Sequence, residues 1–315
     1  MARNPIAEFL AQRPVIILDG ALATELERRG ADLHGPLWSA KLLMEQPSLI
    51  RAVHRDYFEA GADVAITASY QATFEAFGRR GVDPTQAAQL MRESVALAIS
   101  ARDEFWSDAH NRADRLPPLI AASVGPYGAM LADGSEYHGD YGLSDAQLMD
   151  FHRARLHVLT DSGADLLACE TIPSLREAMV LARLLQERPD ASAWVSFACR
   201  DAEHTCEGQG IAECVAKLDE FAQIVAIGVN CTRPEYVGPL LRRMRSHTDK
   251  PLVAYPNSGE RYDAEARRWL AHADAKPFAE LALDWYAAGA RLIGGCCRTT
   301  PADIHRLREG LLQCA

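Results

Sequence analysis

Residues 292–301 have the sequence Leu-Ile-Gly-Gly-Cys-Cys-Arg-Thr-Thr-Pro. A short apolar run ends in two glycines and two adjacent cysteines, and Thr300 and Pro301 then match an N-cap followed by proline in the first turn of a helix. The stretch therefore predicts a strand, a polar turn and a helix, in that order. Because consecutive side chains of a strand point to opposite faces, the two thiols can reach one centre only if the backbone turns, and Gly295 permits such a turn.

The same order of strand and helix recurs along the chain. Apolar runs with little alternation are typical of strands buried on both faces, and they alternate here with segments of helical periodicity. Gly61, Gly163 and Gly289 each stand where a helix is expected to end in a left-handed residue. Asp83 and Ser144 predict helix N-termini. The apolar runs are residues 15–18, 64–67, 119–123, 166–170, 193–197, 224–230, 252–255 and 292–294.

This alternation predicts a parallel sheet with right-handed crossovers. The chain has 315 residues, and a closed barrel of eight strand–helix units typically needs about 250. We therefore predict an α/β protein whose residues 1–315 form one (β/α)8 TIM barrel domain. The alternative is a doubly wound sheet, but no Gly-x-Gly-x-x-Gly follows the first run and no phosphate-binding loop is present. Segments 125–142 and 256–276 are predicted to be long functional loops at the C-terminal face of the barrel.

Composition and charge exclude several classes of protein. The chain is 48% hydrophobic and 24% charged, as is typical of a globular protein. A formal net charge of −10 disfavours a nucleic-acid surface. No apolar run approaches the roughly 20 residues that span a membrane, and no apolar signal region follows the first residues. We expect a cytoplasmic enzyme that acts on small molecules, as a monomer or a small homo-oligomer.

Polar side chains gather directly after the predicted strands. Each one alone is equally consistent with a helix cap or a turn, but in a barrel all of them would surround one mouth. Their common position favours a functional site there. They are Asp19, Thr67, Ser69, Ser123, Glu170, Asn230, Cys231, Asn257, Glu260, Cys296 and Cys297.

Three of these residues predict a zinc site. Cys231 follows one strand, and Cys296 and Cys297 follow another, so their thiolates can converge on one ion whose preferences they suit. A disulfide between adjacent cysteines would be strained, whereas burial of the free thiols is a real alternative. No fourth cysteine or histidine stands beside them, which favours an open, catalytic position. The scattered cysteines, Cys199, Cys206, Cys214 and Cys314, are predicted to pack in the core.

An open zinc position of this kind suits chemistry at sulfur. A coordinating thiol is deprotonated by the metal, and the thiolate is the nucleophilic form at neutral pH. Three thiolate ligands donate so much charge that a bound water is acidified less than it is by histidine ligands. The pattern therefore favours alkyl transfer to sulfur over hydrolysis.

Several motifs resemble those of the homocysteine S-methyltransferase family. The resemblance covers about residues 15–305, and a Gly-Gly-Cys-Cys sequence with an upstream Asn-Cys is highly specific to that family. It is strongest to the stand-alone bacterial branch that uses S-methylmethionine as methyl donor. The matching segments are residues 19–26, 66–72, 123–129, 131–137, 169–173, 228–231, 255–260 and 294–297.

The resemblance implies a zinc-containing barrel that methylates homocysteine to methionine, in methionine biosynthesis, by direct attack of a zinc-bound thiolate on the sulfonium methyl group. It matches Cys231, Cys296 and Cys297 to the zinc ligands. It matches Asp19 and Glu170 to the carboxylates that hold the amino group of homocysteine, which agrees with the need of a buried ammonium for such a partner. Positions near the substrate backbone match Gly20, Ala21 and Ser69.

The donor pocket is specified less fully. Aromatic faces attract a sulfonium, and the candidates for this contact are Trp38, Tyr127, Tyr137 and Tyr141. S-adenosylmethionine and betaine are alternative donors. We expect betaine to be disfavoured, because these 315 residues do not include the long C-terminal extension expected of betaine-dependent relatives, and we expect no cobalamin or folate module. An alternative of another class is a thiol-binding or regulatory barrel whose zinc is structural.

Overall fold

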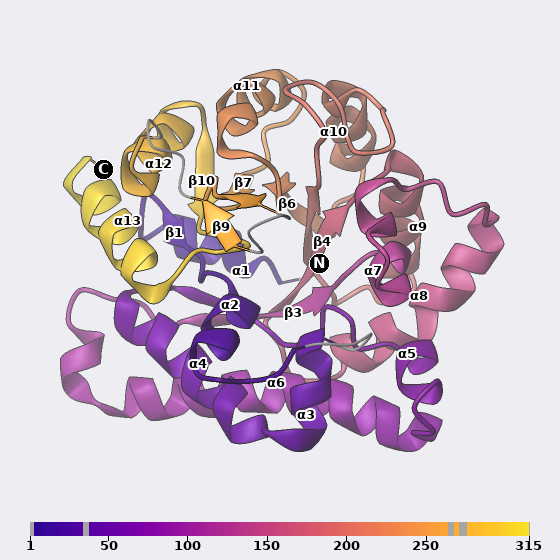
Figure 1. The fold of residues 1–315 in the computed structure, drawn as a ribbon. Helices are drawn as coiled ribbons and strands as arrows, with labels where there is room; N and C mark the ends of the chain where they lie inside the picture. The colour runs from indigo at the N-terminus through magenta and orange to yellow at the C-terminus, as the bar shows by residue number, and fades with distance from the viewer. Residues whose placement is uncertain (1–2, 34–37, 264–267, 271–275, 315) are drawn as a thin grey trace.

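Eight parallel strands form one sheet that curls into a barrel in the computed structural model (Figure 1). The structure describes residues 3–33, 38–263, 268–270 and 276–314, and the side chains of residues 38–39, 261–263 and 268–270 lie outside this description. A parallel bridge between Leu18 and Val64 links the two outer strands. The order around the barrel is β1-β10-β7-β6-β5-β4-β3-β2. The strands are β1 Ile16–Ile17, β2 Val64–Ile66, β3 Leu119–Val124, β4 Leu166–Ile172, β5 Ala193–Phe197, β6 Ile224–Asn230, β7 Leu252–Tyr255 and β10 Ala290–Ile293.

The predicted fold class is confirmed, and each strand overlaps one of the apolar runs. Helices surround the barrel and cover the outer faces of the strands (Figure 1). The ring contains α4 Pro47–Ala60, α6 Pro84–Ser107, α8 Asp145–Thr160, α9 Leu175–Leu185, α10 Ile211–Asp219, α11 Pro234–Arg245, α12 Phe278–Ala287 and α13 Pro301–Cys314. Shorter elements are α1 Pro5–Leu10, α2 Leu22–Arg28, α3 Leu42–Glu45, α5 Phe74–Gly78 and α7 Tyr127–Leu131, with the 3-10 helices η1 Trp38–Lys41, η2 Ala109–Arg112 and η3 Ser135–Tyr137.

Alternation along each strand divides the apolar side chains between two cores. One core fills the space between the strands and the ring of helices. The other fills the barrel interior, where α1 contributes Ile6 and Phe9. Because α1 precedes the first strand, it closes the N-terminal face and leaves the C-terminal face open. The strand residues of the interior core are Ile16, Leu18, Val64, Leu119, Ala121, Leu166, Ala168, Trp194, Val225, Ala226, Val253, Tyr255 and Leu292.

The predicted helix boundaries are also confirmed. The Asp83 carboxylate accepts hydrogen bonds from the backbone of the first helical turn, and Ser144 forms a reciprocal capping box with Gln147. Gly61 and Gly289 have φ values of 114° and 107°. Gly61 caps the C-terminus of α4, and Gly289 stands two residues after the end of α12. At each glycine the left-handed backbone ends the helix and lets the chain turn into the next strand.

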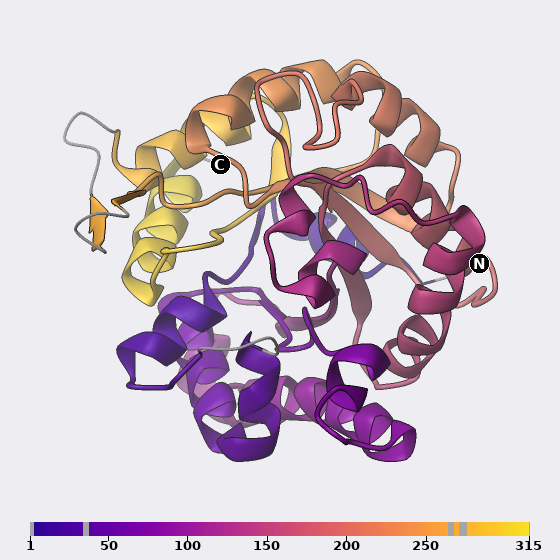
Figure 2. The ribbon, with the colours of Figure 1, turned by 45° about the vertical axis from the view of Figure 1, so that its right-hand side comes forward.

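The two long loops contain more regular structure than the sequence predicts. The segment 125–142 includes α7 and η3, and the segment 256–276 includes an antiparallel pair, β8 Arg261–Asp263 and β9 Arg268–Leu270. Figure 2 shows this pair standing out from the barrel. Elements of three to five residues are too short to reveal a hydrophobic period. None of the helices in the described ranges combines the length and apolar character needed to cross a membrane.

Candidate metal centre and active site

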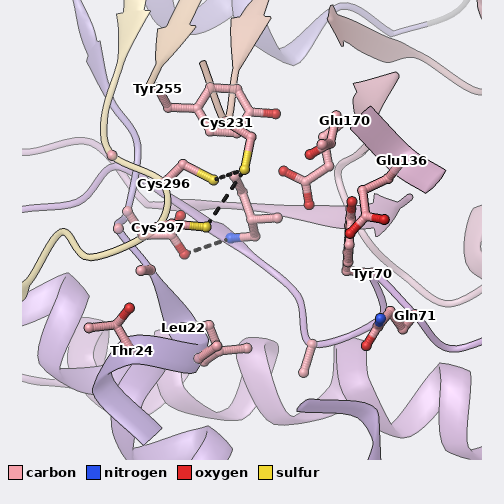
Figure 3. Close-up of a pocket in the computed structure, with 18 of the residues that line it drawn as sticks. Leu22, Thr24, Tyr70, Gln71, Glu136, Glu170, Cys231, Tyr255, Cys296 and Cys297 are labelled. Carbon is pink, nitrogen blue, oxygen red and sulfur yellow. Dashed lines mark hydrogen bonds between the residues drawn. The ribbon is translucent and has the colours of Figure 1, made fainter. Parts of the chain in front are cut away.

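Three cysteine thiols converge at the C-terminal mouth of the barrel (Figure 3). Cys231 follows β6, and Cys296 and Cys297 follow β10. The Cys231 Sγ lies 3.3 Å from the Sγ of Cys296 and 3.6 Å from that of Cys297. All three are free thiols, and their sulfur atoms lie within 4.8 Å of one another. The convergence predicted from strands six and eight of the barrel is therefore present.

The turn that joins the two adjacent cysteines is built differently from the prediction. In this turn the left-handed residue is Arg298, with φ 70°. Cys231, which follows β6, is also left-handed, with φ 49°. Gly295 is not among the residues with positive φ; a Cβ there would lie 2.3 Å from the Thr299 Oγ1. A Cβ at Gly294 would lie 2.6 Å from that of Leu18. Glycine is required in this stretch because the backbone passes so close to its neighbours.

Hydrogen bonds from neighbouring loops hold the turn. The backbone N–H of Cys296 donates to the Pro256 carbonyl over 2.8 Å, and the Cys297 carbonyl accepts from the Ser258 N–H over 3.0 Å. The Arg298 side chain pairs with Glu260, with Nε 2.7 Å from Oε2. The loop after β7 therefore fixes the position of both thiols.

The three sulfur atoms perturb one another. Hydrogen bonds from the thiols of Cys231 and Cys296 lower the pKa of Cys297 well below its ordinary value. The hydrogen bond with Cys231 raises the pKa of Cys296, and burial adds to the rise. The cluster gives up one proton readily and resists losing more, unless a cation neutralises the sulfur atoms. A soft metal ion satisfies this requirement, so the donor set fits a metal.

The thiols line a cavity of about 400 Å³, a size typical of small-molecule sites. Its walls come from the ends of β1, β2, β4, β6, β7 and β10 and from the loop that contains η3. The lining residues are Asp19, Gly20, Ala21, Leu22, Ala23, Thr24, Ile66, Thr67, Ala68, Tyr70, Gln71, Ala132, Gly134, Glu136, Tyr137, Glu170, Thr171, Cys231, Tyr255, Gly295, Cys296 and Cys297.

Two predicted carboxyl groups, Asp19 and Glu170, lie in this cavity. The Asp19 Oδ2 accepts a hydrogen bond of 2.8 Å from the Ile66 N–H. Burial raises the pKa of Asp19 well above its ordinary value, and the nearby Glu170 adds to the rise. Burial also raises the pKa of Glu170 to about 7, although hydrogen bonds from Ser123 and Tyr255 favour the ionised form. Both carboxyl groups would be stabilised as anions by a cationic ligand.

The residues predicted near the substrate backbone occupy different places. Gly20 and Ala21 line the cavity. A Cβ at Gly20 would lie 2.9 Å from the Thr299 Oγ1, so this position requires glycine. Ser69 is fully buried beside the lining residues, and its hydroxyl donates to the Ser123 carbonyl over 2.8 Å. Ser69 thus joins the ends of β2 and β3.

Of the predicted aromatic residues, Tyr137 lines the cavity, and its hydroxyl lies 3.2 Å from the Cys231 Sγ. Tyr127 packs instead against Tyr141 and Phe151, with ring centroids 5.2 and 4.9 Å away. The side chain of Trp38 lies outside the described part of the structure.

Tyr70, Gln71, Glu136 and Tyr255 are among the lining residues that sequence reasoning did not single out. Each belongs to a segment that the family resemblance includes, so the signal was present, but sequence alone does not tell which side chain of a loop faces the cavity. Among the scattered cysteines, Cys199 and Cys214 are buried and Cys206 is half-buried. Core packing was the wrong prediction for Cys314, which is exposed on the last turn of α13.

Comparisons with known proteins agree with this geometry. The sequence model of the family described as homocysteine S-methyltransferase matches residues 16–311. The chain is 53% identical to homocysteine S-methyltransferase YbgG of Bacillus subtilis, over 96% of each chain. It is 51% identical to homocysteine S-methyltransferase of Escherichia coli, over 97% of this chain and 98% of that one. The crystal structure of the metallated form of the homocysteine methyltransferase MmuM from Escherichia coli aligns with a TM-score of 0.88 and 48% identity, covering 97% of this chain and 99% of that one. The chain is therefore an enzyme of the homocysteine S-methyltransferase family.

Proposed function

We propose that this enzyme transfers a methyl group from S-methylmethionine to L-homocysteine, giving methionine. The observation that carries the proposal is a cluster of three thiols in a cavity that also contains the buried carboxyl groups of Asp19 and Glu170. A substrate with a thiol at one end and an ammonium at the other matches both features. The relatives named for homocysteine methyl transfer support the same acceptor.

Zinc is the proposed metal, with Cys231, Cys296 and Cys297 as its ligands. Three thiolates suit the softness and tetrahedral preference of zinc and leave its fourth position open. A metallated form of the Escherichia coli relative supports the presence of a metal in this chain as well. When bound, the ion would hold the sulfur of homocysteine and favour its thiolate form at neutral pH.

Asp19 and Glu170 would hold the ammonium group of homocysteine. A carboxylate that loses water by burial is stabilised most by a partner with a full positive charge and hydrogen bonds to donate. Gly20 and Ala21 line the same cavity, so the substrate backbone would lie beside them. The substrate would then be fixed at both ends, which limits the positions that its sulfur can take.

The transfer itself would be one displacement. The homocysteine thiol has lost its proton to solvent, and a lone pair of its sulfur forms a bond to the methyl carbon. The bond between that carbon and the sulfonium sulfur breaks, and its electron pair stays on the leaving methionine. No proton moves at the reacting carbon, so the residues in the cavity need only align the two sulfur atoms and exclude water.

Aromatic side chains would bind the sulfonium through their electron-rich faces. Tyr137, which lies beside Cys231, is the best placed of the predicted residues, and Tyr70 and Tyr255 line the same cavity. The packing of Tyr127 against Phe151 favours a supporting role for its ring. The contact of Trp38 with the donor stays a prediction.

The test is an assay of purified enzyme with homocysteine and each donor in turn: S-methylmethionine, S-adenosylmethionine and betaine. We expect methionine to form fastest with S-methylmethionine and the protein to contain one zinc per chain by elemental analysis. Cys297→Ser should lose the zinc and lower kcat/KM at least about a hundredfold. The matched control is Cys314→Ser, a change of an exposed cysteine that should keep both properties.

Two outcomes would contradict the proposal in different ways. Normal activity in Cys297→Ser protein without metal would exclude a catalytic metal. Wild-type protein that holds zinc and binds homocysteine but transfers no methyl group from any donor would favour the thiol-binding or regulatory barrel.

A further inference from the structure

Two buried oxygen atoms beside the cavity lack hydrogen-bond partners among the described residues. Gln71 is 6% exposed, and its Nε2 donates to the Ala129 carbonyl over 2.8 Å. That bond fixes the orientation of the amide and leaves its Oε1 without a donor. The Oε2 of Glu136 is likewise buried and without a partner. Buried acceptors are nearly always satisfied in native proteins, so each of these two oxygen atoms calls for a hydrogen-bond donor from outside the described residues.

Both residues are held by the same short helix, α7. Gln71 bonds to Ala129 of this helix. The backbone of Glu136 packs so closely on Gly128 that a Cβ there would lie 2.4 Å from the Glu136 nitrogen. The two acceptors therefore belong to one preorganised wall of the cavity. In Figure 3 they lie with Tyr70 on the side of the cavity away from the three cysteines.

The negative charge of the cavity indicates that the missing hydrogen-bond donor is a cation. Asp19, Glu170 and Glu136 all line it, and the described lining residues include no lysine, arginine or histidine. Burial raises the pKa of Glu136 above its ordinary value, which a neighbouring cation would oppose. The ammonium of homocysteine is assigned to Asp19 and Glu170. Glu136, the third carboxyl group, then has no counter-ion among the described lining residues.

We propose that Glu136 and the Gln71 Oε1 bind the α-ammonium group of the methyl donor, and so select donors that are amino-acid sulfoniums. This inference rests on the proposed function, and it assigns the part of the donor that lies away from the reacting sulfur. In S-methylmethionine the ammonium is separated from the sulfonium by the carbons Cα, Cβ and Cγ. The donor can thus present its methyl group toward the cysteines while its ammonium meets the opposite wall.

The same site explains how a quaternary ammonium donor would be rejected. Betaine carries a positive charge but no N–H group, so it cannot donate a hydrogen bond to either acceptor. A site built to accept hydrogen bonds discriminates strongly against a ligand that lacks the donor, because its buried polar groups then stay unpaired.

The test compares two sulfonium donors in steady-state assays: S-methylmethionine and its desamino analogue, 4-(dimethylsulfonio)butanoate. The isosteric change Glu136→Gln should raise the KM for S-methylmethionine about tenfold to a hundredfold, since a charge-assisted hydrogen bond is lost. The kcat/KM for the desamino analogue and the KM for homocysteine should not change. Gln71→Leu should show the same pattern, and calorimetric titration of S-methylmethionine should show weaker binding to both variants.

The matched control is Asp140→Asn, which neutralises an exposed carboxyl on the same loop and outside the cavity. It should leave all of these constants unchanged. An unaltered KM for S-methylmethionine in both cavity variants would overturn the site, and so would an equal loss for both donors. Wild-type enzyme that transfers no methyl group from S-methylmethionine would instead overturn the proposed function together with the site.

Discussion

At the scale of single residues, Thr299 joins the first and last motifs of the chain. Its Oγ1 accepts from the Ala21 N–H over 3.2 Å and donates to the Cys296 carbonyl over 2.7 Å. Gly20 and Gly295 leave the space that this hydroxyl occupies. The Thr299 side chain therefore links Ala21, a proposed substrate contact, to Cys296, a proposed metal ligand.

Another residue, His54, is expected to make the stability of the fold depend on pH. It is fully buried in α4, and neither ring nitrogen has a hydrogen-bond partner among the described residues. Burial lowers its pKa to about 4, compared with about 6.5 in an unfolded chain. The unfolded state therefore binds more protons between these values. Folding stability should be complete above about pH 6.5 and should fall by up to about 3 kcal/mol as the pH decreases through 4.

The measurement is the free energy of unfolding in urea across this pH range, for the wild type and for His54→Leu. The variant should lack the part of the slope that His54 contributes. Parallel curves for the two proteins between pH 4 and 6.5 would show that the histidine is protonated equally in both states.

At the scale of elements, α8 and α9 support the loop that contains Glu136 and Tyr137. The Glu177 Oε1 on α9 accepts from the Tyr127 N–H over 2.6 Å and is 2.8 Å from the His152 Nε2. Both side chains of this pair are completely buried. The first turn of α7 is thus tied to a polar group behind the cavity, so the loop does not depend on its own short elements for its position.

Breaking this support should affect both stability and donor binding. Glu177→Ala leaves His152 and the Tyr127 N–H without their acceptor, so we expect a loss of about 3 kcal/mol in the free energy of unfolding. The KM for the donor should rise more than that for homocysteine. The matched control is Glu187→Ala, which removes an exposed ion pair with Arg153 and should cost less than about 1 kcal/mol. Equal effects of the two substitutions would contradict a special role for the buried pair.

The sequence predicts the long strands and the cysteine cluster, but it does not predict the short elements of the loops. Strands such as Ile224–Asn230 are evident because burial on both faces removes polar residues from them. The cysteine cluster is predicted because its residue types are rare and its position after strands is informative. By contrast, η3 has three residues, which is too few to show a hydrophobic periodicity. Whether Ser69 or its neighbours Tyr70 and Gln71 face the cavity depends on how the backbone turns after β2, and sequence does not specify that turn.

At the scale of the whole molecule, the apolar residues that stabilise the barrel and the polar residues proposed for catalysis gather toward opposite ends of it. The interior core includes α1 at the N-terminal end of the barrel, while the thiols and carboxyl groups surround the C-terminal mouth, where Tyr255 belongs to both the core and the cavity wall. Figure 1 shows α1 across the centre of the barrel. The polar groups at the mouth are therefore free to be arranged for a ligand, because apolar burial at the other end supplies much of the free energy of folding.

A pair of substitutions tests this separation. Phe9 of α1 is 5% exposed in the interior core, and Phe9→Ala should cost about 3–5 kcal/mol through lost burial and the cavity left behind. At a temperature where the variant is still folded, its kcat/KM for homocysteine should equal that of the wild type. Glu170→Gln should do the reverse: the homocysteine KM should rise at least about tenfold, because an ionic partner of the ammonium is lost, while stability is kept or increased. Thermal unfolding and steady-state kinetics on the same preparations give both readouts. A loss of kcat/KM in fully folded Phe9→Ala protein would mean that α1 influences the position of the mouth through the strands. The two ends of the barrel would then have to be treated as one cooperative unit.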